Sequence, residues 1–174
     1  MKGEERSMKK IILSLVSAAF VLMLAACGAP TATAPAENAA ANAGESAAVQ
    51  DAPMSYVSPD DLKATLAQPD ASEKVVVLDV RKAEDFEKDA IDGAIGADMD
   101  AAKAGDMESG KANMQGALEQ AGLYKDGQLV ESDKELVLVC YSGKSYAQAA
   151  TNVLNEIGYD MNNVKTLEGG MKAW

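Results

Sequence analysis

The sequence contains no histidine and only two cysteines, Cys27 and Cys140, among its 174 residues. The lack of histidine excludes catalysis by an imidazole base and metal sites built from imidazole ligands. Aromatic residues are scarce, at 5%, and the 16 basic residues are outnumbered by 27 acidic ones, which gives a net charge of -11. This negative charge argues against binding to nucleic acid and against adsorption on anionic lipid headgroups.

Long apolar runs are also lacking, since the longest, from Ile11 to Leu24, falls short of the about 20 residues that span a bilayer. This run follows two lysines and precedes small residues, which is typical of a secretory signal. Leu24-Ala25-Ala26-Cys27 then resembles the lipobox of bacterial lipoproteins, in which the cysteine is acylated and becomes the new N-terminus. We therefore predict a signal peptide over residues 1–26 and an extracytoplasmic chain anchored to the bacterial cell membrane through Cys27. An uncleaved anchor is the alternative.

Residues 27–53 are predicted to form a flexible tether. Of the 26 residues after the acylated cysteine, 11 are alanine, and Val49 is the only large aliphatic residue. Such a segment cannot bury enough apolar surface to offset the entropy lost on ordering. Residues 54–174 are then sufficient for one folded domain. Two acidic residues ahead of the signal core leave Met1 and Met8 as alternative translation starts.

Strands and helices are predicted to alternate along this domain. Apolar runs rich in β-branched residues predict strands, whereas apolar residues at three- and four-residue spacings predict helices. The predicted strands cover residues 74–80 (a central strand), 94–95, 135–140 and 163–167. The predicted helices begin near residues 58, 83, 113 and 145, and tight turns are predicted at 92–93 and 125–127. This alternation predicts an α/β fold with a mostly parallel sheet covered on both faces.

Cys140 lies where a predicted strand ends and a helix begins, at the edge where open α/β sheets bind ligands. A loop containing Gly143 lets backbone N–H groups converge on an anion, while Lys144 and the helix beginning near Ser145 add positive charge. These features stabilise a thiolate and favour a nucleophile. A buried structural cysteine is the alternative. Lipidation of Cys27 would leave Cys140 without a partner in the chain, which favours a working thiol or an intermolecular bond.

Several motifs together resemble the rhodanese-like domain, in the order and spacing of that family. They are Leu-Asp-Val-Arg at 78–81, Glu-Asp-Phe at 84–86, Ile-Asp-Gly-Ala-Ile at 91–95, Cys-Tyr-Ser-Gly-Lys-Ser at 140–145 and Leu-Glu-Gly-Gly-Met-Lys-Ala-Trp at 167–174. The resemblance implies a single rhodanese-like domain with a five-stranded, mostly parallel sheet and helices on both faces.

The resemblance also implies a sulfurtransferase in which Cys140 is the nucleophile. Its thiolate would take the outer sulfur of a small sulfane-sulfur donor such as thiosulfate, and a thiol acceptor or cyanide would then take that sulfur. No cofactor and no metal are implied. The anionic persulfide would be bound by the backbone of the loop, that is by Tyr141, Ser142, Gly143, Lys144 and Ser145. Arg81 is a further candidate for binding an anionic donor, although we favour a structural ion pair with Asp79.

Some residues depart from the family pattern. The related phosphatases have a longer loop with arginine at the position of Tyr146, so phosphoryl transfer is not expected here. Tyr141 stands where many members have a basic residue, which weakens the case for thiosulfate and leaves a persulfide donor or thiol redox chemistry. A non-catalytic rhodanese-like module that binds a partner protein is the second hypothesis, supported by Tyr141 and the acidic composition. The donor, the acceptor and the oligomeric state stay open at this point.

Overall fold

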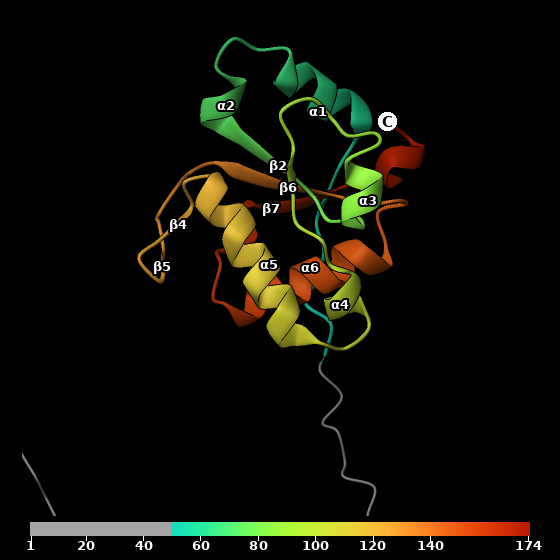
Figure 1. The fold of residues 1–174 in the computed structure, drawn as a ribbon. Helices are drawn as coiled ribbons and strands as arrows, with labels where there is room; N and C mark the ends of the chain where they lie inside the picture. The colour runs from blue at the N-terminus through green and yellow to red at the C-terminus, as the bar shows by residue number, and fades with distance from the viewer. Residues whose placement is uncertain (1–49) are drawn as a thin grey trace, which may run out of the picture. The chain divides into compact units, whose positions relative to one another are not determined.

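Five strands form the sheet at the centre of residues 50–174, the part of the chain that the computed structural model describes (Figure 1). Their order across the sheet is β1 (Tyr56–Val57), β7 (Val164–Leu167), β6 (Glu135–Val139), β2 (Val75–Asp79) and β3 (Ile95–Gly96). Every neighbouring pair in this sheet is parallel. The predicted α/β class and the five-stranded parallel sheet are confirmed.

The two longest strands, β2 and β6, pair along their whole length, from Val75 opposite Glu135 to Asp79 opposite Val139. Strand β2 is apolar up to its last residue, Asp79, and β6 is apolar after its first residue, Glu135; all residues except Glu135 are buried. Burial on both faces is what such runs indicate in a parallel sheet. The middle strand of the sheet is β6, and β2 lies beside it with a strand on each side, so the prediction that residues 74–80 form a central strand is confirmed. Two equally apolar strands cannot be ordered from their composition.

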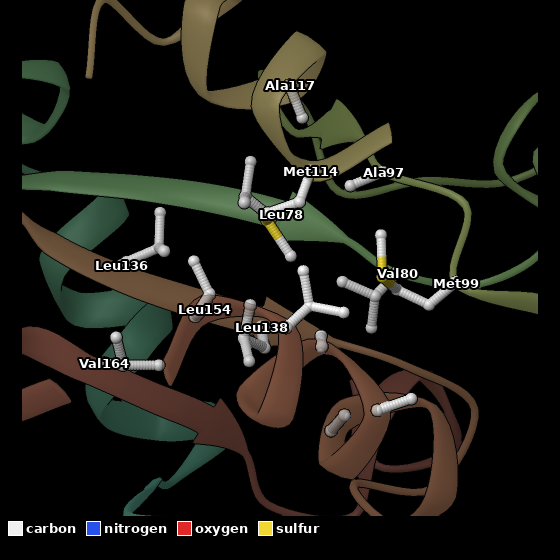
Figure 2. Close-up of a cluster of buried hydrophobic side chains, with 14 of the residues drawn as sticks. Leu78, Val80, Ala97, Met99, Met114, Ala117, Leu136, Leu138, Leu154 and Val164 are labelled. Atoms are coloured by element: carbon white, nitrogen blue, oxygen red, sulfur yellow. The ribbon is translucent and has the colours of Figure 1, made fainter. Parts of the chain in front are cut away.

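Side chains alternate between two apolar cores, one on each face of the sheet, because successive strand residues point to opposite sides. On one face, Leu78 and Leu138 pack with Met114 of helix α5 (Met107–Gln120) and Leu154 of helix α6 (Ser145–Glu156), and Figure 2 shows these side chains gathered between strands and helices. On the other face, Val77, Val137, Val139 and Leu167 pack with Leu62 of α1. Helices thus cover both faces, as predicted.

For two of the three longer helices, a capping side chain accounts for the residue at which the helix begins. Helix α1 (Pro59–Leu66) begins after Ser58, whose side chain accepts a hydrogen bond from the N–H of Asp61. Helix α5 (Met107–Gln120) begins six residues before the predicted start because Asp106 caps it by accepting from the N–H of Ser109. Helix α6 (Ser145–Glu156) begins directly after the cysteine loop.

The remaining elements are short. The single-turn helices are α2 (Ala71–Lys74), α3 (Ala83–Phe86) and α4 (Asp100–Lys103), and the 3-10 turns are η1 (Met161–Asn163) and η2 (Gly170–Lys172). The predicted turn at 125–127 joins an antiparallel hairpin of β4 (Tyr124–Lys125) and β5 (Gln128–Leu129). Asp126 and Gly127 both have positive φ, 52° and 80°, as such two-residue turns require. Sequence analysis missed α2, α4, β1 and the hairpin strands because each has only two to four residues.

The domain's contacts begin before the predicted boundary at residue 54. Ala52 is buried, its N–H donates to Asn152 Oδ1 and its carbonyl accepts from Gln148 Nε2. These bonds attach the incoming chain to α6. The predicted signal peptide, Cys27 and most of the tether lie outside the described residues. Within residues 50–174, none of the helices has both the length and the apolar character needed to cross a bilayer.

Candidate active site

Cys140 follows the last residue of β6, and five residues later α6 begins, so the cysteine loop lies at the carboxyl edge of the sheet. Gly143 has φ 68°, which a residue with a side chain rarely adopts. A Cβ atom at Gly143 would also lie 2.7 Å from the carbonyl oxygen of Leu167 at the end of β7. The glycine therefore lets the loop turn tightly against the neighbouring strand.

A second glycine holds the loop from outside. Gly170 has φ 59°, and a Cβ atom there would lie 2.2 Å from the Cys140 carbonyl oxygen and 2.6 Å from the Ser142 nitrogen. The next N–H, that of Met171, donates to the Cys140 carbonyl at 2.8 Å, and Lys172 N–H donates to the Tyr141 carbonyl at 3.2 Å. The segment after β7 thus clamps the carbonyls of the loop. In the sequence Gly170 stood out only as part of the motif at 167–174, and nothing placed it against the cysteine.

Four backbone N–H groups of the loop have no hydrogen-bond partner among the described residues. Among residues 50–174, no acceptor takes a hydrogen bond from the backbone N–H of Tyr141, Ser142, Gly143 or Lys144. Buried backbone donors are nearly always paired in native proteins, so the unpaired N–H groups of half-buried Tyr141 and Ser142 and of buried Gly143 are notable. Consecutive free N–H groups ahead of a helix form the kind of site that binds an anion.

The thiol of Cys140 is deeply covered, with an exposed fraction of only 1%. It forms no disulfide among the described residues and belongs to the same apolar cluster as Tyr146, which is itself 9% exposed. Lys144 and Ser145, in contrast, are exposed, and Ser142 is half-buried. The predicted loop therefore presents polar groups outside and its sulfur inside, so a donor reaches the sulfur only after neighbouring side chains move.

Two tyrosines tie the loop to the segments opposite it. Tyr141 Oη donates to Asp85 of α3 at 2.5 Å, and Tyr146 Oη donates to Asp100 of α4 at 2.6 Å. The two rings pack edge to face with centroids 5.2 Å apart. Burial, and then the hydrogen bond to the carboxylate, raise the pKa of both phenols. Both therefore stay neutral donors at physiological pH.

The same hydrogen bonds act on the carboxylates. Tyr141 is the main cause that lowers the pKa of Asp85, and Tyr146 is the main cause that lowers the pKa of Asp100. Both carboxylates are thus charged at neutral pH. Each is paired with a lysine, because Lys88 Nζ lies 3.2 Å from Asp85 and Lys82 Nζ lies 3.4 Å from Asp100. Nothing in the sequence pattern pairs each tyrosine with its carboxylate, because 46 and 56 positions separate the partners.

Arg81 forms the ion pair with Asp79 that sequence analysis favoured. Its Nε and Nη2 donate to both carboxylate oxygens at 2.7–3.1 Å, Nη2 also donates to the carbonyl of Asp89, and Arg81 and Asp79 are 6% and 1% exposed. The bonds to Asp79 raise the pKa of Arg81, so it is charged at any working pH. The guanidinium carbon lies 5.8 Å from the centroid of the Tyr141 ring, but the guanidinium is already hydrogen-bonded to Asp79 and Asp89.

Removing Asp79 is expected to destabilise the domain strongly. Asp79→Ala leaves the Arg81 charge buried without its partner, which typically costs about 3–5 kcal/mol in the free energy of unfolding. Asp70→Ala is the matched control, because the Asp70–Lys74 pair is half exposed and such pairs contribute roughly 0–1 kcal/mol. Urea denaturation measures both changes. Equal losses in the two variants would contradict the structural role given to Asp79.

Two cavities of the described residues lie away from Cys140. One of about 680 Å³ lies beside the first half of β2, and one of about 410 Å³ is lined by Arg81, Phe86, Asp98 and Asn113, among others. Neither is lined by the cysteine loop. No group of three acidic or cysteine side chains within 50–174 is arranged to hold a metal ion.

Comparison with known proteins shows the family to which the chain belongs. The model of the rhodanese-like domain matches residues 58–174, so the chain belongs to the rhodanese-like family, which includes sulfurtransferases. A search of curated proteins finds no match.

Solved structures with similar folds come from several organisms. One is the human single-domain sulfurtransferase TSTD1, with 20% identity, 70% of this chain and 96% of that chain covered, and a TM-score of 0.46. Another is an uncharacterised protein of Saccharomyces cerevisiae, with 26% identity, 71% and 92% covered, and a TM-score of 0.47. A third is a rhodanese-related protein of Thermoplasma volcanium, with 21% identity, 69% and 89% covered, and a TM-score of 0.42.

Proposed function

We propose that this protein is a sulfurtransferase that carries sulfane sulfur on Cys140. The observation that carries the proposal is the row of unpaired N–H groups from Tyr141 to Lys144 directly after the only cysteine of the domain. A persulfide is an anion at neutral pH, and unpaired N–H groups in the loop that follows the cysteine are the kind of donors that stabilise such an anion. Membership of the rhodanese-like family, which implies sulfur donors and acceptors as substrates, supports the same chemistry.

The reaction has two displacement steps. The Cys140 thiolate attacks the outer sulfur of the donor, a new S–S bond forms, and the donor's S–S bond breaks with its electron pair on the leaving group, which is sulfite when thiosulfate is the donor. An acceptor thiolate then attacks the outer sulfur of the cysteine persulfide. The electron pair of the bond that breaks returns to Cys140, and the acceptor leaves as its own persulfide. No external oxidant or reductant is needed.

The surroundings of the loop favour a persulfide over thiosulfate as donor. Lys88, Lys82 and Arg81 are each engaged by a carboxylate, that of Asp85, Asp100 and Asp79 respectively, so these cations do not offer their full charge to a donor. A dianion such as thiosulfate depends on a free cation more than a monoanionic low-molecular-weight persulfide does. We expect turnover with a persulfide donor and a thiol acceptor to exceed turnover with thiosulfate by about tenfold or more. Equal rates with both donors would contradict this assignment, and no turnover with either would contradict the proposed activity.

Burial of the thiol favours one second candidate, a binding module without catalysis. A sulfur that is 1% exposed resembles a structural cysteine as much as a nucleophile. The two candidates differ in whether the tyrosines can move aside, because a binding module needs no access to sulfur. The labelling rate of Cys140 in the parent protein reports whether the tyrosines move aside, and variants at Tyr146 test whether its ring is what covers the thiol.

Tyr146→Ala is expected to speed the labelling of Cys140 by a small thiol reagent by about tenfold or more, because it removes a ring from the cluster that covers the sulfur. Tyr146→Phe is the control, since it keeps the ring and loses only the hydrogen bond to Asp100. Its labelling rate should stay within about threefold of the parent. Circular dichroism confirms that each variant is folded. An unchanged rate in folded Tyr146→Ala would show that Tyr146 does not cover the thiol.

We further propose that the protein acts outside the cytoplasm, bound to the bacterial cell membrane through lipid on Cys27. The support is the apolar segment followed by Leu24-Ala25-Ala26-Cys27. Cys27→Ser is expected to move the protein from the membrane fraction to the soluble or precursor fraction and to abolish incorporation of labelled fatty acid. Cys140→Ser should change neither result. Membrane association that persists without acylation in Cys27→Ser would point to an uncleaved anchor instead.

A further inference from the structure

Strand β2 is paired with a neighbouring strand along its whole length on one side but only at its last two residues on the other. On its β6 side β2 is paired at all five residues, but on the other side it pairs with β3 only at Leu78 and Asp79. The loop before β3 turns at Gly93 (φ 78°) and joins the sheet only at Ile95. Val75 to Val77 therefore have no strand beside them on that side.

Backbone groups on this open edge lack partners. Val80 N–H donates toward β6, to Val139, and the Asp79 carbonyl accepts from Ala97 on the β3 side. Because backbone groups alternate along a strand, Val75 and Val77 direct theirs to the β3 side as well. The Val75 N–H donates to Ala71, but within residues 50–174 neither the Val75 carbonyl nor the Val77 N–H is bonded to the loop that precedes β3. An acceptor and a donor are thus free along the edge.

The cavity of about 680 Å³ lies against this same edge. Val75, Val76 and Val77 line it, and the remaining wall is mainly apolar, with Leu66, Ile91, Ile95, Ala121 and Trp174. Its volume is in the range of ligand pockets, about 300–1,000 Å³. An extended segment laid along β2 could therefore place an apolar side chain in it.

Two lysines line the cavity, although the chain as a whole is acidic. Lys63 and Lys134 line it, against one carboxylate, that of Asp92. Lys63 is engaged by Trp174, whose carbonyl accepts from Nζ at 2.9 Å and whose ring lies 4.8 Å away. The Lys134 ammonium makes neither an ion pair nor a hydrogen bond with any residue of the described domain. It is the cation available to a ligand carboxylate.

We infer that the open edge of β2 binds an extended acidic peptide segment of a partner protein. The peptide backbone pairs with the Val75 carbonyl and the Val77 N–H, an apolar side chain fills the cavity, and a neighbouring carboxylate binds Lys134. Backbone pairing of this kind is a common mode of peptide recognition at sheet edges. Because Cys140 does not line the cavity, the inference is independent of the proposed sulfur transfer.

The test is an NMR titration of the full chain, in which the valines are isotope-labelled, with peptide added up to millimolar concentration. The probe is the blocked peptide Glu-Val-Thr-Val-Glu, compared with Lys-Val-Thr-Val-Lys. We expect the acidic peptide to shift the amide signals of Val75, Val76 and Val77, to slow hydrogen exchange at Val77, and to bind about tenfold more tightly than the basic one. An acidic peptide with its central N–H methylated should bind more weakly.

Charge reversal supplies the matched variants. Lys134→Glu should remove the preference for the acidic peptide, whereas Lys125→Glu, exposed on the hairpin and outside the cavity, should keep it. Equal affinity for both peptides, no shift at Val75–Val77, or the same loss in Lys125→Glu would overturn the inference. Concentration-dependent shifts of these signals without peptide would overturn it in favour of a second copy of the chain on the edge.

Discussion

Replacing Cys140 by serine is expected to abolish sulfur transfer, with a loss of at least about a thousandfold in turnover, because a hydroxyl cannot form the persulfide intermediate. Turnover is measured with a persulfide donor and a thiol acceptor, following loss of donor. The substitution changes one buried atom, so the fold should survive, which thermal unfolding confirms.

The control uses the other cysteine. Cys27→Ser keeps Cys140 and should retain the parental rate when the enzyme is assayed in solution. A Cys140→Ser protein that still transfers sulfur at a comparable rate would show that the reaction proceeds without a covalent intermediate on this residue. If Cys27→Ser lost activity and Cys140→Ser kept it, the nucleophile would be Cys27 and not Cys140.

Gly170→Ala is expected to damage both stability and transfer, because the added methyl group collides with the loop. Its Cβ would lie 2.2 Å from the Cys140 carbonyl oxygen and 2.6 Å from the Ser142 nitrogen, both backbone atoms that cannot rotate away. The positive φ adds about 1–2 kcal/mol of strain. We expect a loss of at least about 3 kcal/mol in the free energy of unfolding. A shift of the loop by about an ångström should also lower turnover about a hundredfold.

Gly122→Ala separates the collision from the strain. Gly122 has a similar φ of 73°, but a Cβ atom there would meet nothing within 4 Å. It should therefore lose only the about 1–2 kcal/mol due to backbone strain and keep full activity. Denaturation curves and turnover are measured for both variants. If the two lose the same stability and activity, Gly170 does not clamp the cysteine loop.

Sequence patterns predicted the parts of the fold in which local chemistry and final burial agree. The runs at Val75–Asp79 and Glu135–Val139 are apolar at nearly every position, and a strand buried on both faces requires that. Ser58 ahead of Pro59 correctly predicted the start of α1. The order of strands was not predictable, because it depends on which apolar runs pair across more than 50 residues.

Only the part of the candidate site that is contiguous in the sequence was predictable. The position of Cys140 between strand and helix follows from the run of residues on either side. The bonds from Tyr141 to Asp85 and from Tyr146 to Asp100 join segments about 50 residues apart, so no local pattern signals them. Burial of the thiol was equally hidden, since it follows from packing around the loop. Gly143 and the double glycine at 169–170 were the visible signs of a close approach at the site.

The most direct test of the account is the intact mass of the full chain carrying Cys27→Ser, after incubation with a sulfane-sulfur donor and removal of excess reagent. Cys140 is then the only thiol in the chain. The account predicts a mass gain of one sulfur atom that disappears with reductant and is absent when Cys140→Ser is added. A folded protein whose mass does not change with any donor, although its thiol can be labelled, would contradict sulfur transfer and leave the binding module.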